Sequence, residues 1–206
     1  MKLLINTTSP YTRIARIALA EKGLEDVTTE IVDPWGDTPA LLEANPAARV
    51  PTLIGDDGRP LTESLLILLW LEHQRPVPSL LVNSTADAAA SEDPTAVVSR
   101  AGAAMGVIDA AVHTLIGRKI TDASFDGSPI GLRRRRTMAD ALLRLEADPP
   151  VYTDGTPTID VIAAVVALDY VDFRFPQVAW LPKFPKLRAL SARLAPRASF
   201  ERSRPT

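Results

Sequence analysis

The sequence has no cysteine among its 206 residues. Disulfide bonds and thiolate metal ligands are therefore excluded, and a nucleophilic sulfur must come from a bound ligand. The two histidines, His73 and His113, are isolated, and no His/Asp/Glu spacing indicates a metal site. A glycine-rich phosphate loop and a nucleophile elbow are also missing. We therefore expect no metal.

An excess of either charge is also missing. The chain has 23 Lys and Arg against 25 Asp and Glu, for a net charge of -2. This balance argues against nucleic acid as the main partner. Four consecutive arginines, Arg133–Arg136, would spread around a helix, and we expect them to be mostly solvated and to pair with Asp140, Glu146 or Asp148.

Long apolar runs are absent too. The longest, LLILLWL at 65–71, is far shorter than the roughly 20 residues that a membrane span requires. We read it as part of a buried helix and expect no membrane partner. The first residues, MKLLIN, turn polar too early for a signal peptide. A cytoplasmic protein is expected.

The first third of the chain alternates between strand and helix patterns. Short apolar or β-branched stretches predict strands, and longer stretches with cap and stop signals predict helices. The predicted strands cover 2–6, 27–32, 51–55 and 60–63, and the predicted helices cover 10–22, 38–45 and 64–74. This order predicts an α/β domain with a mixed sheet.

The rest of the chain reads as helical. Residues 76–95 are rich in Pro, Ser, Asp and Ala, which indicates a linker. Helices are predicted at 95–119, 129–147, 159–173 and 183–195. We therefore divide the chain into an α/β domain at 1–76 and an all-helical domain at 90–206, both within the usual size of domains.

Ser9 and Pro10 open the first predicted helix. Serine is a favoured N-cap and proline is favoured at the first helical position, so Ser9 can be read as a helix cap alone. A helix N-terminus also gathers partial positive charge and free N–H groups. A hydroxyl there can donate a hydrogen bond to a bound anion, and the two readings are compatible.

Two further dipeptides, Val50-Pro51 and Glu63-Ser64, can each be interpreted as structural or as ligand-binding. Val50-Pro51 is an ordinary entry into a strand, or a cis bond that leaves the Val50 backbone free to pair with an extended peptide; only about 5–6% of X-Pro bonds in folded proteins are cis. Glu63-Ser64 either caps the next helix or grips an amino-acid head group. In the second case Glu63 would hold the ammonium, and Ser64 with the first helical N–H groups would hold the carboxylate.

Together these motifs resemble the glutathione transferase superfamily. TSPYTRIARIALAEKGL (8–24) resembles its serine-type active-site segment, NPAARVPTL (45–53) its Asn-Pro-x-x-x-Val-Pro loop, and LTESLLILLWLE (61–72) its glutamyl-binding segment. GVIDAAV (106–112) and LDYVDFRFP (168–176) resemble helical-domain segments of bacterial members. One departure occurs before Tyr170, where Val161 takes the place of the family's aspartate and Asp160 comes one residue early. The resemblance implies a thioredoxin-like N-terminal domain followed by an all-α C-terminal domain, which is the glutathione transferase fold.

The resemblance also implies the chemistry. Glutathione would be the co-substrate, and its thiol would be conjugated to a small electrophile. Ser9 matches the residue that activates the thiol by donating a hydrogen bond, with the Thr8 hydroxyl as a backup. Further positions match the glutathione-binding residues of the family: Arg49 for the glycyl carboxylate, Val50 and a cis Pro51 for backbone pairing, and Glu63 and Ser64 for the γ-glutamyl group.

The resemblance places the electrophile pocket between the two domains. Tyr11, Met105, His113 and Trp180 are candidates for its wall, although each is also readable as an ordinary packing or surface residue. Trp35 falls on a loop that borders the peptide site in the family. Family members usually form homodimers, so we expect one here. A non-catalytic regulatory module and a glutathione-dependent isomerase or lyase remain alternative functions.

Overall fold

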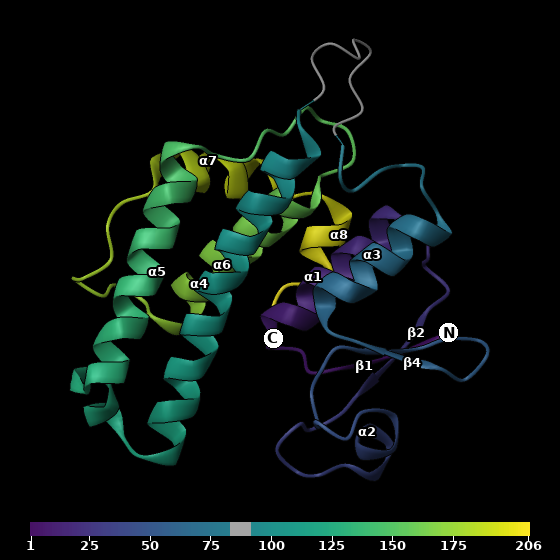
Figure 1. Ribbon diagram of the computed structural model, residues 1–206, viewed down its shortest axis with the longest axis horizontal. Helices are drawn as coiled ribbons and strands as arrows, with labels where there is room; N and C mark the ends of the chain where they lie inside the picture. The colour runs from purple at the N-terminus through teal and green to yellow at the C-terminus, as the bar shows by residue number, and fades with distance from the viewer. Residues whose placement is uncertain (83–91) are drawn as a thin grey trace.

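The computed structural model describes residues 1–82 and 92–206, so the middle of the predicted linker, 83–91, lies outside the described residues. The first part contains β1 (Lys2–Ile5), α1 (Pro10–Glu21), β2 (Thr28–Ile31), α2 (Pro39–Ala44), β3 (Thr52–Ile54), β4 (Pro60–Thr62) and α3 (Ser64–Gln74). The second contains α4 (Pro94–Ile120), η2 (Ala123–Gly127), α5 (Pro129–Ala147), α6 (Ile159–Arg174), α7 (Pro185–Leu194) and α8 (Ala198–Glu201). The expected α/β part followed by a helical part is confirmed (Figure 1). The domain bounds at 76 and 90 stay predictions.

The four strands form one mixed sheet in the order β2-β1-β3-β4. Strand β1 is parallel to β2 and antiparallel to β3, and β3 and β4 form an antiparallel pair. Helices α1 and α3 lie on one face of the sheet and α2 on the other (Figure 1). Because side chains alternate along a strand, Leu3 and Ile5 join the core under α1, whereas Leu4 joins a smaller cluster with Leu41 of α2.

Helix α1 packs on both parts of the chain. Its apolar side chains lie in the core against α3 and the sheet, and the helix also contacts α6. Near its start, the Arg13 guanidinium donates to Asp169 of α6 at 2.7 Å. At its end, Glu21 forms a two-bond ion pair with Arg197, with both N–O distances at 2.6 Å. The helix is thus fastened to the second part at both ends.

Helix α6 is buried along nearly its whole length, with α4 and α1 packed against it. At its start, the fully buried Asp160 accepts hydrogen bonds from the Thr158 hydroxyl at 2.6 Å, from the Val161 N–H at 2.9 Å and from Arg100 of α4 at 2.7 Å. Burial raises the pKa of Asp160, and these bonds oppose that rise. The acid that stands one residue early in the sequence therefore links α6 to α4.

Helix α4 has the length and composition of a membrane-crossing helix, with a mean hydropathy of 1.3 over its most apolar stretch. This is weak evidence for a membrane span, because the core helix of a soluble protein passes the same test. Here α4 packs against α5 and α6, and its buried side chains belong to the main core.

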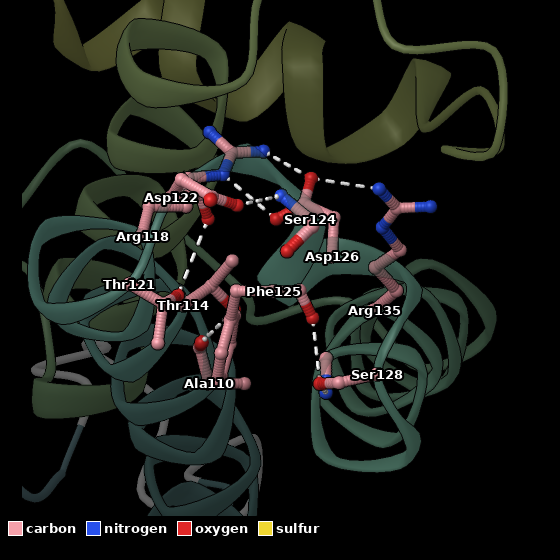
Figure 2. Close-up of polar contacts among 11 residues, drawn as sticks. Ala110, Thr114, Arg118, Thr121, Asp122, Ser124, Phe125, Asp126, Ser128 and Arg135 are labelled. Atoms are coloured by element: carbon pink, nitrogen blue, oxygen red, sulfur yellow. Dashed lines mark hydrogen bonds and ion pairs between the residues drawn. The ribbon is translucent and has the colours of Figure 1, made fainter.

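The turn between α4 and α5 shows that the expected partners of the four consecutive arginines were wrong for Arg135. Arg135 pairs with Asp126 of η2 at 2.7 Å, not with Asp140, Glu146 or Asp148 (Figure 2). Arg118 of α4 donates to the same carboxylate through two bonds, which lower the pKa of Asp126 to about 2 against the opposing effect of burial. The sequence pattern predicted neither η2 nor α8, and the partner of Arg135 lies on the unpredicted η2.

Two of the three expected partners, Glu146 and Asp148, contact other elements. Both carboxylate oxygens of Glu146 accept backbone N–H groups at the start of α7, from Lys186 at 2.8 Å and Leu187 at 3.0 Å. Asp148 lies 3.5 Å from Arg100. Glu146 of α5 and Asp148, the residue that ends it, therefore contact neighbouring helices instead of the four consecutive arginines.

We predict that Gly131→Ala lowers the free energy of unfolding by about 1–3 kcal/mol, the usual effect of overpacking. A Cβ at Gly131 would lie 2.1 Å from the Phe125 carbonyl oxygen, which belongs to the backbone of η2. Gly102 of α4 is the matched control, because a Cβ there meets no atom within 4 Å. Gly102→Ala should raise stability by about 0.5–1 kcal/mol. Urea unfolding checks both, and equal stabilities would contradict the close approach at Gly131.

Candidate active site

Ser9 is the N-cap of α1. Its Oγ accepts a hydrogen bond from the Thr12 N–H at 3.2 Å, so the predicted cap is confirmed. Within the described residues the Ser9 O–H is not donated to any acceptor, which leaves its proton available for a ligand. The cap therefore does not use up the hydroxyl, because the oxygen accepts one bond while the proton stays free.

Thr8 differs from Ser9 in this respect. Its hydroxyl donates to the Asn6 side-chain oxygen at 2.9 Å, and its backbone N–H donates to the same oxygen at 3.1 Å. The Thr8 proton is thus held inside the loop before α1. Of the two hydroxyls named from the sequence, the one of Ser9 is free to donate and the one of Thr8 is occupied.

The Val50–Pro51 bond is cis, as the resemblance implies. Asn45 and Thr52 hold the loop that precedes it, because both side chains donate to the Arg49 carbonyl oxygen, at 3.1 Å and 2.9 Å. The Asn45-Pro46 motif was recognised in the sequence, but no role was predicted for Asn45. The signal was available, since an asparagine before a proline favours a turn.

Glu63 and Ser64 stand where β4 passes into α3. Glu63 is the N-cap and Ser64 the first helical residue. Glu63 has a φ of 65°, a left-handed conformation that costs a non-glycine residue roughly 1–3 kcal/mol and that clusters at ligand sites. Ser64 is 2% exposed, and its hydroxyl has no hydrogen-bond partner among the described residues. The start of α3 therefore combines a strained acidic residue with a buried serine.

Arg49 lies beside this helix start. Its guanidinium is 3.5 Å from the Glu63 carboxylate, and the two side chains are 71% and 56% exposed. An ion pair that is so exposed contributes little, about 0–1 kcal/mol, so a charged ligand can replace it. The structure therefore brings Arg49 and Glu63 together, from the loop before β3 and the end of β4.

Tyr11 reaches from α1 to the second part of the chain. Its hydroxyl donates to the Asp109 carboxylate of α4 at 2.5 Å. Met105 and His113 stand four residues before and after Asp109, so the three lie along one face of α4. The structure thus brings Tyr11 to the helix face that carries Met105 and His113. Asp109 was missed from the sequence, although its spacing of four from both neighbours was readable.

Two tryptophans take different positions. Trp180 packs edge-on against Phe175 at 6.2 Å between ring centroids, with the Arg135 guanidinium 5.7 Å from its ring. Trp35 is 55% exposed, and the Lys119 ammonium of α4 lies 3.9 Å from its ring centroid. The loop before α2 therefore touches the end of α4.

Burial and neighbouring charges change the pKa of Tyr11 and of Tyr170. Burial is the main cause that raises the pKa of Tyr11 well above its usual value, followed by its bond to Asp109 and by the negative charge of that carboxylate. Burial likewise raises the pKa of Tyr170, which lines a small recess beside Ser9. Both phenols are therefore neutral at physiological pH, and the Tyr11 hydroxyl donates its proton to Asp109.

Metal chemistry finds no support in the described ranges, 1–82 and 92–206. No group of three or more His, Asp or Glu side chains there is placed to hold a metal ion. The arrangement offers instead a free hydroxyl at a helix N-terminus, a buried serine without a partner, and one acidic and one basic side chain at the surface. These groups suit a zwitterionic peptide ligand.

Comparison with known proteins gives this geometry a context. Residues 8–74 match the model of the glutathione S-transferase N-terminal domain. The crystal structure of a glutathione S-transferase from Methylobacterium radiotolerans JCM 2831, in complex with glutathione sulfonate, has a TM-score of 0.81 and 32% identity, over 99% of this chain and 94% of that one.

Two curated proteins add to this. The uncharacterized GST-like protein YibF of Escherichia coli (strain K12) is 28% identical over 100% of this chain and 98% of its own. Maleylacetoacetate isomerase of Pseudomonas aeruginosa is 39% identical over 39% of this chain and 40% of its own. One relative is thus similar over the full length and the other over a part only.

We predict that Asp109→Asn lowers the pKa of Tyr11 by about one pH unit or more, because a negative charge beside a phenol favours its neutral form. Burial remains in the variant, so the value should stay above the ordinary 10. Tyrosinate absorbance against pH checks this in a Tyr152→Phe, Tyr170→Phe background, where Tyr11 is the remaining tyrosine. Asp140→Asn, an exposed acid of α5, is the matched control. An unchanged Tyr11 titration in Asp109→Asn would contradict the assignment.

Proposed function

The chain belongs to the glutathione S-transferase family, and from this premise we propose that it activates the thiol of glutathione through Ser9 and transfers it to a small electrophile. The observation that carries the proposal is the free O–H of Ser9 at the N-terminus of α1. The neighbouring Thr8 hydroxyl is already donated to Asn6, so Ser9 is the donor that remains.

The chemistry follows from the acidity of a thiol. A free thiol has a pKa near 8.5, so only a few per cent is the nucleophilic thiolate at about pH 7. A hydrogen bond from Ser9 and the positive end of α1 both favour the anion over the neutral thiol. Each pH unit by which the pKa falls corresponds to about 1.4 kcal/mol. Ser9 thus acts as a hydrogen-bond donor, not as a covalent nucleophile.

The glutathione peptide would be held by groups from the loop before β3 and from the start of α3. The Val50 backbone, beside the cis Pro51, would pair with the cysteinyl part of the ligand. Glu63 would bind the γ-glutamyl ammonium, and Ser64 with the first N–H groups of α3 its carboxylate. Arg49 would exchange its weak pairing with Glu63 for the glycyl carboxylate.

The electrophile would bind on the other side of the sulfur. We propose Tyr11, Met105 and His113 as part of its wall and add Asp109, because Asp109 holds the Tyr11 hydroxyl. Trp180 stays a sequence-based candidate, since its contacts are with Phe175 and Arg135. A cytoplasmic location, where reduced glutathione is abundant, belongs to the same proposal.

A glutathione-dependent isomerase is the second candidate, favoured by the partial similarity to a maleylacetoacetate isomerase. It would use the same thiol site and differ in the second pocket, so analysis of products separates the two reactions. A regulatory module without catalysis would have no use for a free Ser9 hydroxyl, and retention on immobilised glutathione discriminates it.

Replacing Ser9 tests the thiol activation. We expect wild type to lower the pKa of bound glutathione, followed by thiolate ultraviolet absorbance across pH, and Ser9→Ala to return it towards 8.5 while still binding. A rise of the thiol pKa by one to two units lowers the thiolate fraction, and with it kcat/KM, by roughly 10–50-fold near pH 6.5. Thr8→Val is the matched control and should stay within about threefold of wild type. The opposite ranking of the two variants would assign the role to Thr8.

A second copy of the chain is the proposed protein partner. Helix α3 exposes Leu66 at 58% and Leu69 at 51%, and these two side chains lie one turn apart on the same helix, where a second copy could cover them. Light scattering should give twice the 22.3 kDa of one chain for wild type. Leu69→Glu should give a monomer, whereas a matched Leu132→Glu on α5, which is 52% exposed, should not. A monomeric wild type would contradict the dimer.

A further inference from the structure

A small recess lies between the start of α1 and α6, next to Ser9. Among the residues that line it are Ser9, Pro10 and Arg13 at the start of α1, and Val166 and Tyr170 of α6. Its volume is about 10 Å³. A polar cavity needs roughly 10–15 Å³ to hold a water molecule, so the recess has room for one water. Glutathione and an electrophile are both far too large for it.

Arg13 brings a buried donor to this recess. The residue is 6% exposed, and its Nη1 donates to the Asp169 carboxylate of α6 at 2.7 Å. Its Nε–H is buried as well, but no acceptor lies within hydrogen-bond distance of it in the residues that the structure describes. A buried donor of a charged group is costly to leave without an acceptor. A water molecule in the recess would supply that acceptor.

Ser9 stands one helical turn before Arg13. Residues four apart share one face of a helix, and a long helical side chain points back towards the N-terminus. The two side chains therefore meet at the same recess. The Ser9 Oγ has two lone pairs, of which one accepts the Thr12 N–H at 3.2 Å. The other lone pair can accept a second bond while the proton stays available for the sulfur.

A buried water molecule needs two to four polar partners. Arg13 can donate to it, and Ser9 can accept one of its protons. Thr7, which also lines the recess, donates its own proton to the Thr206 carbonyl oxygen at 3.1 Å, and its hydroxyl oxygen remains as an acceptor for the second proton. The recess therefore offers three partners to one water.

We propose that the recess binds one water molecule that accepts the Arg13 Nε–H and donates to the Ser9 Oγ. The inference rests on the proposed function of Ser9 as the donor to the thiol. Hydrogen bonds in a chain polarise one another, by about 10–30% for each bond. A serine oxygen that accepts a proton from a water held by a guanidinium is a stronger donor. Arg13 is thus a positioning residue, which acts on the sulfur through the water and Ser9.

Replacing Arg13 by lysine tests the bridge. Arg13→Lys removes the Nε–H but keeps a positive charge that can pair with Asp169. It should raise the pKa of the bound glutathione thiol by about half a pH unit, the effect of weakening one hydrogen bond, as followed by thiolate ultraviolet absorbance. Arg16→Lys is the matched control, because Arg16 is the other arginine of α1 and does not line the recess. It should leave the thiol pKa unchanged.

Filling the recess tests the same bridge without changing any charge. Val166→Ile adds a methyl group that displaces the water, and we expect a similar rise of the thiol pKa. Val165→Ile is the matched control, because Val165 is also buried on α6 but does not line the recess. The double variant Arg13→Lys, Val166→Ile should raise the thiol pKa no further than either change alone, because both break one bridge.

A high-resolution crystal structure of the protein without glutathione tests the water itself. Wild type should show density for one water within hydrogen-bond distance of the Arg13 Nε and the Ser9 Oγ, and Val166→Ile should show none. A wild-type recess without this density would overturn the proposal, as would an unchanged thiol pKa in both folded variants. Failure of wild type to bind glutathione would instead contradict the proposed function, and the crystal structure would still decide whether the water is bound.

Discussion

The fastening of helix α1 at both of its ends is the constraint on which the rest of the molecule depends. Arg13 near the start is 7% exposed and pairs with Asp169, and Glu21 at the end is 6% exposed and pairs with Arg197. Breaking a buried pair on one side typically costs about 3–5 kcal/mol, because it leaves an uncompensated charge. Since Ser9 is the cap of this helix, the position of its hydroxyl is set by contacts with the helical part.

Lys22, one residue beyond α1, extends this constraint to α3. Its side chain is fully buried, and its ammonium donates to the Glu72 carboxylate and to the carbonyl oxygens of Arg75 and Pro78. Burial alone would raise the pKa of Glu72, but the bonds from Lys22, Ser79 and Leu80 together lower it. A lowered pKa means that this stabilisation is present at neutral pH and is lost only in acid. Lys22 therefore joins the end of α1 to the end of α3 and to the chain that follows it.

Local patterns were enough to predict most elements, because their signals are local. Caps, prolines and apolar periods placed the bounds of α1, α3 and α5 within one residue. Such patterns could not predict contacts between residues that lie far apart in the sequence. Tyr11 and Asp109 are 98 residues apart, and Arg100 and Asp160 are 60 apart. Neither pairing leaves a mark in the sequence around either residue.

The same distinction divides the candidate site. The side proposed to bind glutathione is built from short segments whose backbone geometry their own residues determine: the Ser-Pro cap, the cis Val-Pro bond and the Glu-Ser helix start. The side proposed to bind the electrophile depends on side chains of α4, which only tertiary packing brings close to Tyr11. Family membership therefore supports a prediction of the thiol chemistry much better than a prediction of the substrate. On the side proposed for the electrophile, the structure itself defines one firm contact, the hydrogen bond from the buried phenol of Tyr11 to the Asp109 carboxylate.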